Sequence, residues 1–123
     1  MPVTQTEKAN RFRALHQGPG IFVMPNPWDA GSARVLAGLG FQALATSSGA
    51  SAGVLGRRDG MVTREEALAQ IRTMAAATDL PLSADLEKDF GNSPDDVAAT
   101  IRRGAGPWHL QLSGRPVALL RAE

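Results

Sequence analysis

Apolar and polar positions alternate along the chain in blocks whose lengths predict helices and strands in turn. Mixed apolar and polar spacing predicts a helix over 6–17. The apolar run 21–24, halted by Pro25 and Pro27, is typical of a strand, and a second apolar run over 41–46 predicts another. A third short apolar stretch follows at 81–86.

Capping signals predict three further helices. Asp29 precedes a run of small helix-forming residues, Thr63 is followed three residues later by Glu66 in a capping-box pattern, and Ser93 with Pro94 precedes two acids. These helices are expected over 30–40, 63–78 and 94–103. The glycine-rich segment 47–60 is expected to be mostly loop, with at most a small helical turn.

The resulting order is helix, strand, helix, strand, long loop, helix, strand, helix. Such alternation predicts parallel strands joined by crossover helices, and therefore an α/β fold. Parallel α/β folds bind their ligands at the carboxyl ends of the strands. Functional side chains are therefore expected just after residues 24, 46 and 84.

Composition excludes several classes of protein. The 123 residues carry 13 basic and 12 acidic side chains, and a net charge of +1 argues against a nucleic-acid surface. No apolar run approaches the roughly 18 residues of a membrane span, and the N-terminus lacks a signal-peptide core. The chain has no cysteine, which excludes disulfides and fits a reducing cytoplasm. We expect one soluble, cytoplasmic domain.

Charge is distributed unevenly along the chain. Residues 1–99 hold 9 basic and 11 acidic side chains, a net charge of −2. Residues 100–123 hold 4 basic side chains against Glu123 alone, a net charge of +3. The last fifth of the chain therefore differs in character from the rest.

Asp85 and Glu87 lie two residues apart at the end of the third predicted strand, so both side chains are expected on one face. Carboxylate oxygens are the ligands that Mg²⁺ prefers, usually with waters retained. The pair therefore predicts a magnesium site. In the alternative interpretation, one acid caps the next turn and the other is solvated.

Other candidates follow the first and second predicted strands. Ser47, Ser48 and Gly49 offer hydroxyls and backbone N–H groups to a carboxylate or phosphate, although small residues also simply permit tight packing. Asp59 precedes glycine, which is a turn signal, and Trp28 is suited either to lining a pocket or to filling the core.

Two strings, PNPWDAGSARVLAGLGFQALATSSGASAGVLGRRDG and LPLSADLEKDFGNSPDDVAATIRR, resemble the isocitrate lyase and phosphoenolpyruvate mutase superfamily. The branch they resemble comprises short bacterial proteins related to phosphoenolpyruvate mutase and 2-methylisocitrate lyase, over about residues 8–105. The resemblance implies a (β/α)8 barrel with an extra N-terminal helix. At this length the chain would form the N-terminal part of the barrel, about three to four βα units.

The resemblance also implies a chemistry and assigns residues to it. The family makes or breaks C–C or P–C bonds beside an α-oxo carboxylate through an enolate, whose charge Mg²⁺ stabilises. The implied partner is a small oxo-carboxylate substrate, and full-length members are homo-oligomers. The implied assignments are metal binding for Asp85 and Glu87, a catalytic role for Asp59, and substrate binding for Ser47, Ser48, Gly49 and Trp28.

The chain departs from the family pattern in two places. Asp89 stands where the family has glycine in D-x-[DE]-x-G-[YF]-G. After Gly104 the family continues with an acidic strand motif and a loop that supplies the acid/base residue, neither of which the sequence contains. We therefore expect a partial barrel over 1–105, a divergent tail over 106–123 produced by a frameshift or a miscalled gene, and an incomplete, weakly active or inactive enzyme.

A different class of function also fits part of the pattern. A receiver-like signalling module, flavodoxin-like in fold, has about this length and binds Mg²⁺ with acids at strand ends. Against it, the chain opens with a helix, and no acidic pair follows the first predicted strand.

Overall fold

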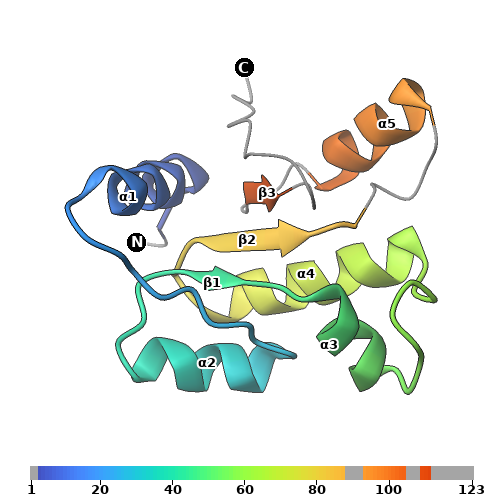
Figure 1. Ribbon diagram of the computed structural model, residues 1–123, viewed down its shortest axis with the longest axis horizontal. Helices are drawn as coiled ribbons and strands as arrows, with labels where there is room; N and C mark the ends of the chain where they lie inside the picture. Colours follow the sequence, from blue (N-terminus) through green and yellow to red (C-terminus); the bar gives the residue numbers. More distant parts are fainter. Residues whose placement is uncertain (1–2, 88–92, 105–108, 112–123) are drawn as a thin grey trace.

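The computed structural model describes residues 3–87, 93–104 and 109–111 (Figure 1). In chain order its elements are α1 (Gln5–Gln17), α2 (Ala30–Gly38), β1 (Leu44–Ala45), α3 (Ser48–Val54), α4 (Arg64–Ala77), β2 (Leu82–Asp85), α5 (Pro94–Gly104) and β3 (His109–Gln111). Within these ranges no helix is long and apolar enough to cross a bilayer.

The helices begin where the capping signals predict. Asp29 accepts a hydrogen bond from the Ser32 N–H at 2.7 Å and so caps α2. Thr63 and Glu66 form the expected reciprocal capping box at the start of α4, and α5 begins at Pro94. Because each cap satisfies N–H groups that have no partner inside the helix, these local signals fix the helix starts.

The sheet contains three parallel strands in the sequential order β1-β2-β3. Leu44 pairs with Leu82, and Ser83 pairs with His109. Sequential parallel order is that of a barrel, whereas a doubly wound receiver fold reverses its strand order. Strand β3 was not predicted from the sequence, since three residues are too short to show a period; the remainder of the segment 106–123 lies outside the described residues.

The prediction of a strand over 21–24 was wrong. This segment runs beside β1, where the Ala45 N–H donates to the Pro25 carbonyl at 3.0 Å. A parallel ladder would continue with the N–H of residue 27 donating to the Ala45 carbonyl, but proline has no N–H. The Asn26 side-chain amide donates to that carbonyl instead, at 2.8 Å. Proline chemistry thus leaves a single ladder bond here and prevents a regular strand.

Two boundaries also differ from the expectation. The second strand is confined to Leu44–Ala45 instead of 41–46, and 48–54 forms helix α3 instead of loop. The Ser47 hydroxyl accepts from the Ala50 N–H at 3.3 Å, which caps this helix and offsets the low helix propensity of its two glycines.

One apolar cluster joins the sheet to the helices α2 and α4, and α5 packs against α4 (Figure 1). Its buried members are Ala33, Leu44, Leu68, Ile71, Met74, Ala75, Leu82, Ala84 and Leu86. The β1 and β2 arrows in Figure 1 point toward α3, so this packing presents the strand ends on the α3 side of the molecule.

Candidate metal and substrate site

Thr46 fixes the point at which β1 and β2 end. Its N–H donates to the Ser83 carbonyl at 2.8 Å, and its hydroxyl accepts from the Asp85 N–H at 2.8 Å. The side chain is buried, with 6% of the residue exposed. Sequence reasoning overlooked Thr46, although a hydroxyl residue closing an apolar run at a strand end is a usable signal.

The Asp85 carboxylate connects the two strand ends. One oxygen accepts from the Ser48 N–H at 3.4 Å, and the other accepts from the Glu87 N–H at 2.9 Å. Both contacts orient the carboxylate at the carboxyl edge of the sheet, as the sequence predicts for a ligand site in a parallel α/β fold.

Glu87 lies in a turn after β2 and not on the strand, where it was expected. β2 ends at Asp85, and Glu87 lies in a turn with φ of 54°, so the two side chains do not share a strand face. Burial is the main cause that raises the pKa of Glu87. Contact with the Asp59 carboxyl and the charges of Asp59 and Asp85 raise this pKa further, whereas the Gly60 N–H lowers it. Two other carboxyl groups therefore lie close enough to act on Glu87.

Asp59 lies on the loop between α3 and α4, in the turn expected from its Asp-Gly sequence. Gly60 has φ of 83° and donates its N–H to Asp59 Oδ1 at 3.0 Å. A Cβ placed on Gly49 would lie 3.7 Å from Asp59 Oδ2, so the absence of a side chain at Gly49 leaves space beside this carboxylate.

The remaining described residues singled out from the sequence do not line the cavity at Asp85. Ser47 caps α3, so its hydroxyl is engaged in the fold. Trp28 is 61% exposed and does not line the cavity at Asp85. Its backbone N–H donates to Ser32 Oγ at 2.8 Å. Asp89 falls outside the described residues. The structure thus brings Ser48, Gly49, Asp59, Asp85 and Glu87 together and leaves Ser47 and Trp28 at the edge.

A cavity of about 10 Å³ lies among these groups, close to the smallest space that holds one water molecule. Its polar wall consists of Thr46, Ser48, Ser51, Asp85 and Glu87, and its apolar wall of Val62, Ala67 and Ile71. Among the described residues, no three His, Cys, Asp or Glu side chains are arranged to hold an ion jointly. The donor set still fits Mg²⁺, because this ion binds one or two carboxylates and keeps several waters.

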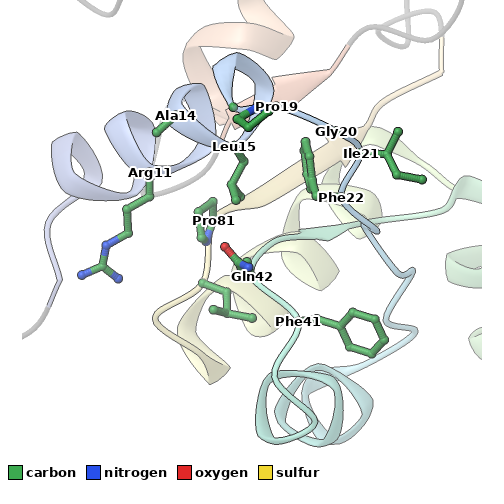
Figure 2. Close-up of a pocket in the computed structure, with 12 residues that line it drawn as sticks. Arg11, Ala14, Leu15, Pro19, Gly20, Ile21, Phe22, Phe41, Gln42 and Pro81 are labelled. Carbon is green, nitrogen blue, oxygen red and sulfur yellow. The ribbon is translucent and has the colours of Figure 1, made fainter.

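A larger cavity, of about 580 Å³, lies at the opposite end of the sheet. It is bounded by α1 and by residues that precede β1 and β2, and Figure 2 shows Leu15 pointing from α1 toward Pro81 while Ile21 points away. Arg11 is its one charged lining residue within the described part of the chain. Its walls are mainly apolar and hold no carboxylate, so the acid chemistry lies at the carboxyl ends of the strands.

The chain is similar to known lyases and mutases. 2-Methylisocitrate lyase of Halalkalibacterium halodurans is 36% identical over 91 residues, which cover 73% of this chain and 30% of that protein. The crystal structure of a Burkholderia cenocepacia J2315 protein classed as a lyase/mutase superposes with a TM-score of 0.80 and 51% identity, covering 82% of this chain and 36% of that one. Oxaloacetate acetylhydrolase in complex with its product oxalate superposes with a TM-score of 0.70 and 28% identity, over 84% of this chain and 36% of that one.

The parallel sequential strands, the N-terminal helix and the strand-end acids define a partial (β/α)8 barrel of the isocitrate lyase and phosphoenolpyruvate mutase superfamily. The family model for phosphoenolpyruvate phosphomutase matches residues 12–106, and the chain belongs to this family. The chain spans about a third of the length of the curated relatives that it matches.

Proposed function

We propose that this chain carries the metal-binding part of a Mg²⁺-dependent lyase or mutase site for small α-oxo carboxylates, with C–C or P–C bonds as the bonds made or broken. The observation that carries the proposal is the convergence of Asp59, Asp85 and Glu87 at the carboxyl edge of the sheet, where Asp59 and Asp85 both raise the pKa of Glu87. Like charges in proximity are costly, and a bound cation offsets that cost.

In this proposal each residue of the site has a separate role in binding the ion or the substrate. Asp85 and Glu87 would hold the ion through their carboxylates, and Asp59 would assist as an acceptor for water at the site. Thr46 keeps Asp85 in place through the hydrogen bond to its N–H. When bound, Mg²⁺ supplies a Lewis acid that stabilises the charge of an enolate. Gly49 leaves room for a substrate carboxylate next to Asp59.

We further propose that the chain by itself is a weakly active or inactive form. Lyase and mutase barrels place catalytic groups on loops after several different strands, and the described residues supply the loop after β1 and the start of the loop after β2. The activity of the family therefore needs groups beyond Asp59, Asp85 and Glu87.

Metal binding tests the first proposal directly. Mn²⁺ replaces Mg²⁺ at oxygen sites and is followed by electron paramagnetic resonance. We expect saturable binding of one Mn²⁺ per chain, and loss of that binding in Asp85→Asn and Glu87→Gln. The matched control is Asp79→Asn, which removes one acid preceding β2 at the opposite end of the sheet from the site. Unchanged Mn²⁺ binding in both site variants would refute the assignment.

The substrate class is tested with oxalate, which the related oxaloacetate acetylhydrolase binds as its product. We expect oxalate to bind this chain only when Mn²⁺ is present, because an ion held by Asp85 and Glu87 would supply the positive charge that attracts the oxalate. Oxalate binding of equal strength without metal would contradict the proposal. Assays with oxaloacetate, 2-methylisocitrate and phosphonopyruvate should give no clear turnover, and clear turnover would contradict the proposed inactivity.

A further inference from the structure

The loop that carries Asp59 has little packing of its own. Residues 53–61 are all exposed, yet the Asp59 carboxyl contacts Glu87 and lies beside Gly49. An exposed segment loses conformational entropy at every residue when it is fixed. Contacts at the ends of the loop must therefore restrain it if Asp59 is to stay at the site.

Arg57 and Glu66 provide such a restraint. Arg57 Nη1 donates to Glu66 Oε1 at 2.5 Å, which joins the start of the loop to the first turn of α4. Glu66 is itself held, because the same oxygen accepts from the Thr63 N–H at 3.1 Å and from its hydroxyl at 2.9 Å. The Arg57 N–H donates to the Ala52 carbonyl in α3 at 2.9 Å. Both partners are thus anchored on helices, and the loop between them is closed.

We propose that the Arg57–Glu66 pair is a positioning device that closes the segment 57–66 and thereby holds the Asp59 carboxylate at the metal site. Neither side chain is needed as a ligand, so both act through Asp59. This inference rests on the proposed function, because it assigns a purpose to the loop only if the acidic residues bind an ion. The Arg57 hydrogen bond is the largest cause that lowers the pKa of Glu66, to about 2, so the pair stays charged even in mild acid.

A positioning role and a simple charge effect predict opposite results for one variant. If Arg57 affects the site only by electrostatic repulsion of the cation, removing its positive charge strengthens cation binding. Removing it weakens cation binding if the pair acts by holding Asp59. Glu66→Gln weakens binding under both mechanisms, and glutamine keeps the capping box because its amide oxygen still accepts from Thr63.

The test measures Mn²⁺ affinity by electron paramagnetic resonance, with folding of each variant confirmed by circular dichroism. We expect Arg57→Met and Glu66→Gln each to weaken Mn²⁺ binding about tenfold, the lower end of what outer-shell substitutions cause. Arg57→Lys should restore most of the affinity. Glu65→Gln is the matched control, because it removes the neighbouring acid of the same helical turn, which pairs with Arg64 and Arg103 instead. Unchanged or tighter binding in Arg57→Met overturns the proposal.

A second measurement separates failure of this inference from failure of the metal site. Backbone relaxation of the metal-free chain reports the order of the Gly60 amide, which lies next to Asp59. We expect lower order in Arg57→Met than in the unmodified chain, and recovery in Arg57→Lys. Absence of Mn²⁺ binding by the unmodified chain would refute the metal assignment, whereas normal Gly60 order in Arg57→Met would refute the positioning role alone.

Discussion

The carboxylate of Asp85 accepts a hydrogen bond from the backbone N–H of Ser48 at 3.4 Å, across 37 positions of sequence. This contact joins the end of β2 to the first residue of α3, which follows β1. It depends on the parallel pairing of β1 with β2, because only parallel neighbours bring their carboxyl ends to the same edge. The candidate site is therefore a direct product of the sheet topology.

Thr46 is expected to stabilise that edge. Thr46→Val removes the hydroxyl that accepts from the Asp85 N–H, and a buried N–H left without a partner costs about 1–3 kcal/mol. We expect the free energy of unfolding in urea to fall by this amount. Thr46→Ser is the control, since it keeps the hydroxyl and should cost less than about 1 kcal/mol. Equal losses in the two variants would show that the hydroxyl contributes nothing.

The sequence predicted where several helices begin better than it predicted where the strands run. The starts of α2, α4 and α5 were predicted correctly, because caps such as Thr63 with Glu66 are local signals. The segment 21–24 was misjudged because its apolar content is that of a strand, while the missing N–H of Pro27 breaks the ladder with Ala45. Such a conflict becomes visible only when the register is known.

Among the site residues, too, some positions follow from the local sequence and others depend on the path of the chain. Asp85 was placed at a strand end from its position alone, and the structure agrees. The approach of Asp59 to Glu87 depends on the path of a loop that closes through Arg57 and Glu66, two residues nine apart. The local sequence pattern does not reveal the contact between Arg57 and Glu66. Without the family resemblance, the sequence therefore predicted only a turn at Asp59.

Leu68 is expected to be critical for stability of the described fold. It lies fully buried in the cluster between α4 and the sheet, and Leu→Ala at such positions costs about 2–5 kcal/mol, the lost transfer energy plus the cavity left behind. We expect Leu68→Ala to lower the free energy of unfolding by that amount. The matched control Leu39→Ala removes the same atoms from a residue that is 71% exposed, and should change stability by less than about 0.5 kcal/mol. Similar losses at both positions would contradict the assigned core.

Two glycines near the site should respond in opposite directions to alanine. Gly49 is helical, and its added Cβ would make only ordinary contact with Asp59, so Gly49→Ala should stabilise the fold by up to about 1 kcal/mol. Gly56 has φ of 69°, a left-handed conformation that costs an L-residue about 1–2 kcal/mol, so Gly56→Ala should destabilise it. Thermal unfolding measures both. A stabilising Gly56→Ala would mean that this turn has another conformation in solution.

Glu66 should make the stability of the fold depend on pH. The Arg57 hydrogen bond, followed by those from Thr63, lowers the pKa of Glu66 from 4.5 to about 2, so folding favours its charged form. The contribution is therefore fully present above the ordinary pKa of 4.5 and is lost progressively as the pH falls from there toward about 2.

Urea unfolding at a series of acidic pH values checks this dependence. Glu66→Gln cannot ionise, so its stability should fall less steeply below pH 4.5 than that of the unmodified chain. Glu65→Gln is the matched control, because Glu65 pairs with Arg64 and Arg103 and leaves Arg57 with its partner. It should keep the steep fall. Identical slopes for Glu66→Gln and the unmodified chain would show that the Arg57–Glu66 pair does not form in solution, and the closure of the loop around Asp59 would then need another cause.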